Sequence, residues 1–141
     1  MPRSRAAVRR PMIAIDTNIL VRLLTRDNPV QAKRAAALFE RKEIYVAKTV
    51  LLETERVLRF SYALNRTVIL TALKNAVGLP HVAVEDGPAV AEALDLFESG
   101  MDFADALHLA SSRSATQFAT FDERLKKHAD KAARGRHVVV A

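Results

Sequence analysis

The sequence of 141 residues is long enough for one domain with a substantial core, and half of its residues are hydrophobic. It contains no cysteine, which excludes disulfides and thiolate metal sites, and no apolar run approaches the roughly 18 residues that a membrane-spanning helix requires. Four of the six net positive charges come from arginines in the first eleven residues, MPRSRAAVRRP. We therefore expect a basic, disordered leader over 1–11, one folded domain over 12–141 and a cytoplasmic protein with no membrane partner.

Apolar residues recur along the chain in patterns that alternate between short strands and amphipathic helices. Gly78 and Pro80 close one of the predicted helices, and Gly100 stops another. Strands separated by helices need crossover connections, so we expect an α/β fold with a mostly parallel sheet and helices on both of its faces. In chain order, the pattern predicts a strand over 12–15, helices over 18–24 and 29–40, a strand over 44–47, helices over 49–62 and 67–76, a strand over 82–84, helices over 87–97 and 102–114, a strand over 118–121, a helix over 123–131 and a strand over 137–140.

Four acidic residues lie at positions that such a sheet would bring to one edge. Asp16 follows the first strand in MIAIDTN, and Asp122 follows the fourth strand in ATFDERL. Glu53 lies in the first turns of the helix after the second strand, and Asp105 lies in the first turn of its helix. Ligands of parallel sheets bind outside the carboxyl ends of the strands. Carboxylates gathered there repel one another unless cations neutralise them, and Mg²⁺ and Mn²⁺ prefer oxygen ligands. The pattern therefore indicates metal-assisted phosphodiester hydrolysis.

Each of these acids also has a purely structural interpretation. Asp16 and Asp122 are placed to cap the helices that follow them. Asp102 and Asp105 have the spacing of a capping box, with Asp in place of the usual Glu or Gln. Glu53 has the spacing to pair with an arginine three residues further along its helix. Composition and periodicity alone therefore predict an α/β domain with a candidate acidic site.

Four segments, taken together, resemble the PIN-domain family, and most closely its bacterial VapC-type toxins. In order, they are MIAIDTNILVRLLTRDNPVQAKRAAALFE, VLLETERVLRFSYALNR, GMDFADALHLASSR and FATFDERLKK. The resemblance covers 12–141 and implies a three-layer α/β/α sandwich around a parallel sheet. Matched to the family motif one position at a time, the catalytic and metal-binding acids fall on Asp16, Glu53, Asp105 and Asp122.

The resemblance extends to polar residues beside these acids. Thr17, Asn18 and Thr120 resemble the family's residues that orient the metal ligands through hydrogen bonds. Asp102 lies one turn before Asp105, and we assign Asp102 to the helix cap and Asp105 to the metal. An acidic side chain at the border of the buried face, as predicted for Asp105, is costly unless a cation or a partner compensates it.

By this resemblance, the protein is a Mg²⁺- or Mn²⁺-dependent endoribonuclease, the toxin of a type II toxin–antitoxin pair, which cleaves structured RNA such as tRNA or ribosomal RNA. Family members of this type are usually homodimers that a cognate antitoxin protein inhibits. The expected partners are therefore RNA, an antitoxin and a second copy of the chain, with Arg22, Arg26 and Arg113 as candidate RNA contacts. Many relatives carry Trp at the position of Arg56, a departure that bears on dimer and partner contacts.

The sequence argues against two alternative functions and leaves two others open. A haloacid-dehalogenase-like phosphatase needs a second Asp two residues after Asp16, where this chain has Asn18. A metal-free ribonuclease needs a catalytic histidine pair, and none of the four histidines lies in a recognisable catalytic setting. A housekeeping RNA-processing PIN nuclease and a non-catalytic RNA- or protein-binding PIN domain stay open. Domains of the latter kind tend to lose the site acids, all four of which are present here.

Overall fold

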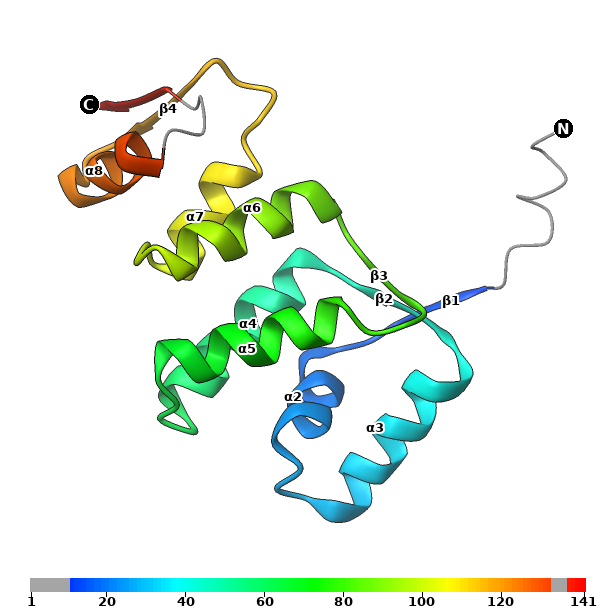
Figure 1. Ribbon diagram of the computed structural model, residues 1–141. Helices are drawn as coiled ribbons and strands as arrows, with labels where there is room; N and C mark the ends of the chain where they lie inside the picture. Colours follow the sequence, from blue (N-terminus) through cyan, green and yellow to red (C-terminus); the bar gives the residue numbers. More distant parts are fainter. Residues whose placement is uncertain (1–10, 133–136) are drawn as a thin grey trace, which may run out of the picture.

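The computed structural model describes residues 11–132 and 137–141. Within these ranges, five short strands and seven helices follow one another in the predicted order (Figure 1). Apart from Pro11, the predicted basic leader lies outside the described residues, so its disorder stays a prediction. None of the described helices has the length and apolar character needed to cross a membrane.

The first half of the chain forms a three-stranded parallel sheet. β1 (Met12–Ala14) pairs with β2 (Glu43–Val46), and β2 pairs with β3 (Val82–Val84). Ile44 in the central strand is completely buried, as expected for a strand with neighbours on both sides and helices packed over it. Asp16 thus lies just after the carboxyl end of β1, immediately before the helix that begins at Thr17.

Two helices make each crossover in this half. α2 (Thr17–Thr25) and α3 (Pro29–Arg41) connect β1 to β2, and α4 (Lys48–Phe60) and α5 (Arg66–Val77) connect β2 to β3. Asn28 shows why one of them begins where it does: its side chain accepts a hydrogen bond from the first turn of α3, and a proline occupies the first helical position. The four helices begin and end within two residues of the predicted bounds.

The second half of the chain contributes a helical pair and a second sheet. α6 (Gly87–Glu98) and α7 (Phe103–Ala110) pack closely against each other, and the rings of Phe97 and Phe103 meet edge to face, with centroids 5.4 Å apart. The chain then forms β4 (Gln117–Thr120), α8 (Glu123–Ala132) and β5 (His137–Val140), and β4 pairs in parallel with β5.

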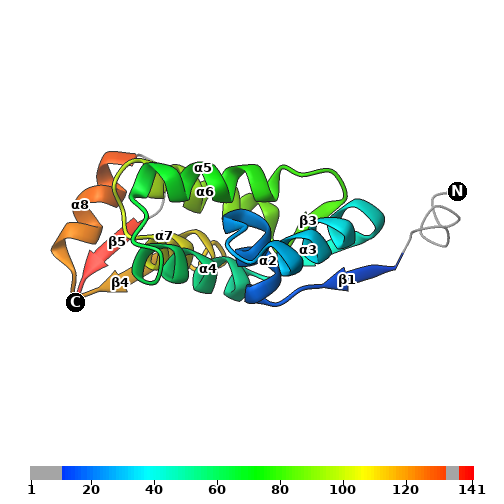
Figure 2. The same cartoon turned by 90° about the horizontal axis from the view of Figure 1, so that it is seen from below.

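The structure confirms the predicted α/β class and its parallel strand pairing, consistent with a three-layer α/β/α fold. The described strands form two hydrogen-bonded groups, however, rather than the one sheet that the alternation of elements predicts. Figure 2 shows the three-stranded sheet at one end of the molecule and the β4–β5 pair at the other, with α4, α5, α6 and α7 between them.

The helix predicted over 102–114 is too long at its carboxyl end. α7 ends at Ala110, and the residues after it form turns. The hydroxyl of Ser112 donates a hydrogen bond to the backbone carbonyl of His108 at 2.7 Å. Serine side chains that bond to nearby backbone groups in this way compete with helical hydrogen bonds, so the serine-rich stretch ends the helix early.

Candidate active site

Asp16 lies at the junction between β1 and α2. Its Oδ1 accepts a hydrogen bond from the backbone N–H of Ile19 at 3.1 Å, which makes Asp16 the N-cap of α2. The residue is exposed to solvent. The structural interpretation of Asp16 is therefore correct for one carboxylate oxygen, and the side chain remains accessible to a ligand from solution.

Glu53 on α4 is joined to the start of α2 by Thr17. The hydroxyl of Thr17 donates a hydrogen bond to Oε1 of Glu53 at 2.6 Å. This contact brings together two segments 36 residues apart in the sequence, and it is the kind of orienting hydrogen bond that the resemblance implies for Thr17. Within the described part of the chain, no ion pair joins Glu53 to Arg56, whose guanidinium lies over the ring of Phe60 instead.

Asp102 and Asp105 have different environments at the start of α7. Oδ2 of Asp102 accepts a hydrogen bond from the backbone N–H of Asp105 at 3.2 Å, so Asp102 is the N-cap, as predicted. Asp105 is half-buried, and burial is the largest cause of the rise in its pKa, followed by the charges of Asp102 and Asp122. The charge of His108 acts in the opposite direction. A cation bound near Asp105 would therefore stabilise the ionised carboxylate and offset the cost of its burial and of the neighbouring negative charges.

Asp122 caps α8 at the end of β4. Its Oδ1 accepts hydrogen bonds from the backbone N–H groups of Arg124 at 2.8 Å and Leu125 at 3.2 Å. Thr120 accepts a hydrogen bond from the backbone N–H of Asp122 at 3.0 Å. Thr120 therefore positions the backbone of Asp122 rather than its carboxylate.

The four predicted acids thus lie in two groups. Asp16 and Glu53 are linked through Thr17, and Asp105 lies within electrostatic reach of Asp122. The structure does not gather all four at one sheet edge, because among the described residues β1 and β4 belong to two separate sheets.

The predicted site residues are suitable ligands for a divalent cation, but they are not arranged around one point. All of these side chains offer carboxylate oxygens, which Mg²⁺ and Mn²⁺ prefer. Nowhere in 11–132 and 137–141, however, are three or more histidine or acidic side chains close enough to hold one metal ion. The arrangement therefore does not by itself form a metal centre, and the metal-binding roles stay predictions.

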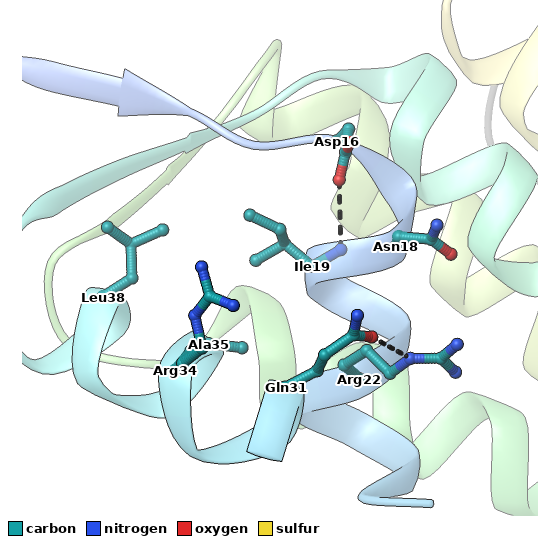
Figure 3. Close-up of a pocket in the computed structure, with 8 residues that line it drawn as sticks. All are labelled: Asp16, Asn18, Ile19, Arg22, Gln31, Arg34, Ala35 and Leu38. Atoms are coloured by element: carbon teal, nitrogen blue, oxygen red, sulfur yellow. Dashed lines mark hydrogen bonds between the residues drawn. The ribbon is translucent and has the colours of Figure 1, made fainter. Parts of the chain in front are cut away.

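A pocket of about 390 Å³ opens between α2 and α3, with Asp16 and Asn18 among the residues that line it (Figure 3). Sequence reasoning overlooked the part that α3 contributes. The sequence signal for this contribution is the helical spacing of Gln31, Arg34 and Ala35, which lie three and four residues apart and therefore share one face of the helix. The remaining lining residues are Ile19, Arg22, Gln31, Arg34, Ala35 and Leu38.

Comparison with known proteins identifies the family. A search among curated proteins finds no match to the chain. The family model of the PIN domain matches residues 13–131, most of the sequence and nearly all of the described fold. PIN domains are generally nucleases, and divalent metals are their typical cofactors. The match contains Asp16, Glu53, Asp105 and Asp122. The chain belongs to the PIN domain family.

Proposed function

We propose that this protein is a metal-dependent endoribonuclease that hydrolyses phosphodiester bonds in structured RNA. The observation that carries the proposal is that a PIN domain here contains the four acids that the resemblance assigns to the site, of which Glu53 accepts a hydrogen bond from Thr17 and Asp105 has a raised pKa beside Asp102 and Asp122. Bound Mg²⁺ or Mn²⁺ would activate water and stabilise the charge on the phosphate. A non-catalytic domain would gain nothing from a half-buried carboxyl beside two other acids, where burial and repulsion both disfavour the charged form.

The toxin role forms the second part of the proposal. It is supported by the four sequence segments that resemble VapC-type toxins in order and spacing. On this proposal, the protein arrests translation in the cytoplasm by cutting tRNA or ribosomal RNA, forms a homodimer and is inhibited by a cognate antitoxin. The excess of positive charge favours a polyanionic substrate such as RNA.

A cleavage assay with one matched pair of variants tests the enzyme assignment. The purified protein should cut structured RNA in Mg²⁺ or Mn²⁺ and stop in EDTA. Asp16→Asn retains a side-chain oxygen that can cap α2, so it should fold normally and lose cleavage. Asp130→Asn removes a carboxylate from a surface ion pair with Lys126 and should stay fully active. Cleavage in EDTA, or by Asp16→Asn, would contradict the proposal.

Growth of a bacterial culture tests the toxin role separately. Induced expression of the wild-type chain should halt growth, whereas Asp16→Asn should not. Co-expression of the protein encoded next to this gene should restore growth. If the purified enzyme cuts RNA but its expression leaves growth unaffected, the toxin role is wrong and a housekeeping RNA-processing nuclease is the better assignment.

A further inference from the structure

The pocket between α2 and α3 is lined by both apolar and cationic side chains. Ile19 and Leu38 are among its apolar lining residues, and Figure 3 shows the guanidinium of Arg34 between these two side chains, with Asp16 lining the same pocket. Its volume of about 390 Å³ is in the range of pockets that hold small ligands. A flat apolar group and an anion would therefore both find complementary surfaces beside Asp16.

Arg22 in this pocket is already engaged by other side chains. Its Nε donates to Oε1 of Gln31 at 2.7 Å, and its Nη1 donates to Asp27 at 3.1 Å and to the hydroxyl of Tyr62 at 3.0 Å. Hydrogen bonds from Tyr62 and Thr25 and the charge of Arg22 hold the pKa of Asp27 below its ordinary value. Asp27 therefore stays ionised and balances the charge of Arg22.

Arg34 differs from Arg22 in having no such partner. It is exposed, and within 11–132 and 137–141 it makes neither a hydrogen bond nor an ion pair. A guanidinium binds phosphate through paired N–H groups and also stacks on flat rings. The charge of Arg34 is therefore available to a ligand in the pocket, whereas the charge of Arg22 is largely used to hold α2, Gln31 and Asp27 together.

We propose that this pocket is the subsite for a nucleotide that neighbours the cleaved phosphodiester. The phosphate of this nucleotide binds Arg34, and its base lies against Ile19 and Leu38. The inference rests on the proposed nuclease function, which puts the reacting phosphate at Asp16 on the rim of the same pocket. Single-stranded segments of RNA offer both groups at once, because their unstacked bases are free to pack on protein side chains.

The first experiment compares Arg34→Gln with Lys33→Gln. Both variants remove one exposed positive charge from α3, but only Arg34 lines the pocket. Binding of a fluorescent structured RNA is measured in EDTA over a series of salt concentrations, so that cleavage does not contribute. Arg34→Gln should weaken binding roughly tenfold, the loss expected for a hydrogen bond to a charged group, and lower the salt slope by about 0.7. Lys33→Gln should weaken binding less than about twofold, as expected for a distant surface charge.

The second experiment tests the position of the base. Once the cleavage site has been mapped, single abasic nucleotides are placed on either side of it. An abasic nucleotide at one of these positions should weaken RNA binding by the wild-type protein. The same RNA should lose less affinity for Arg34→Gln, because contacts within one subsite are coupled. Equal effects of the abasic nucleotide in both proteins would contradict the subsite.

The outcomes separate the subsite from the proposed function. If the wild-type protein cuts and binds RNA but Arg34→Gln and Lys33→Gln behave alike, the subsite is wrong and the nuclease assignment stands. If Arg34→Gln leaves RNA binding unchanged and instead weakens binding of the antitoxin, the pocket is a protein-docking site. If the folded wild-type protein neither binds nor cuts RNA, both proposals fail.

Discussion

Asp102 holds the backbone of Asp105 in place through its side chain. Oδ2 of Asp102 accepts a hydrogen bond from the N–H of Asp105 at 3.2 Å, and Oδ1 of Asp102 lies 3.7 Å from Nη2 of Arg59 on α4. Asp102 therefore caps α7 and connects it to α4, whereas the carboxylate of Asp105 takes no part in the cap. This difference between two acids three residues apart leads to opposite expectations for their variants.

Asp105→Asn should abolish cleavage and weaken Mn²⁺ binding, because it removes the charge of the half-buried carboxylate that the proposed mechanism uses. Asp102→Asn keeps a capping oxygen and should retain substantial activity, with less than about 1 kcal/mol lost from the free energy of unfolding. Calorimetric titration with Mn²⁺ distinguishes the two variants. If Asp102→Asn is the variant that loses the metal, the two roles are reversed.

The raised pKa of Asp105 predicts a pH-dependent effect on stability. In the folded protein this carboxyl keeps its proton above its ordinary pKa of 3.8, so its ionisation at higher pH lowers the free energy of unfolding. In the absence of metal, Asp105→Asn should be more stable than wild type at pH 7, by less than about 1 kcal/mol because solvent screens a half-buried group. The difference should shrink as the pH falls through the raised pKa and vanish below 3.8.

Urea unfolding at a series of pH values checks this prediction. Asp130→Asn is the control, because it removes a carboxylate that is paired with Lys126 on the surface. This variant should gain no stability at pH 7. A difference between Asp105→Asn and wild type that grows as the pH falls would contradict the predicted sign.

The ion pair between the buried Glu55 and the partly exposed Arg59 predicts a large effect on stability. The side chain of Glu55 is only 2% exposed, and its two oxygens lie 2.8 Å and 3.2 Å from Nε and Nη2 of Arg59. Arg59→Met would leave a buried charge without its partner and should cost about 3 kcal/mol of unfolding free energy. The double variant Glu55→Leu with Arg59→Met should recover much of this loss.

A surface pair serves as the control for this measurement. Lys74 and Glu98 form an ion pair at 3.1 Å with both side chains about half exposed. Lys74→Met should therefore cost less than about 1 kcal/mol in the same denaturant titration. Similar losses for Arg59→Met and Lys74→Met would show that burial of Glu55 does not govern the energetics.

The hydrogen bond from Thr17 to Glu53 predicts an effect on activity without loss of the fold. Thr17→Val preserves the side-chain shape but removes the hydroxyl that lies 2.6 Å from Oε1 of Glu53. Partners that orient metal ligands are typically worth about 10- to 100-fold in activity, so kcat should fall by roughly tenfold or more. Thr67→Val makes the same exchange near the start of α5 and should leave kcat unchanged. Equal kcat values for the two variants would show that Thr17 does not orient Glu53.

Local sequence patterns determined the kind and order of the elements. Helical and strand periodicity act over only a few positions, so the helix predicted over 29–40 agrees with α3 to within one residue. The strands over 82–84 and 137–140 were predicted to the residue. The cap role of Asp102 was also readable, because an N-cap depends on atoms within one turn of helix.

Only the tertiary structure decided which strands pair and which side chains meet. In the described residues β4 pairs with β5 and no strand joins it to β1, and a strand's own sequence does not encode which neighbours it takes. The acids of the two halves form no cluster of three or more there. The burial of Glu55 and the position of Arg34 in the pocket likewise depend on helices that pack from elsewhere in the chain. Periodicity reports which face of an element is apolar, but contacts between distant segments depend on how those faces are brought together in the fold.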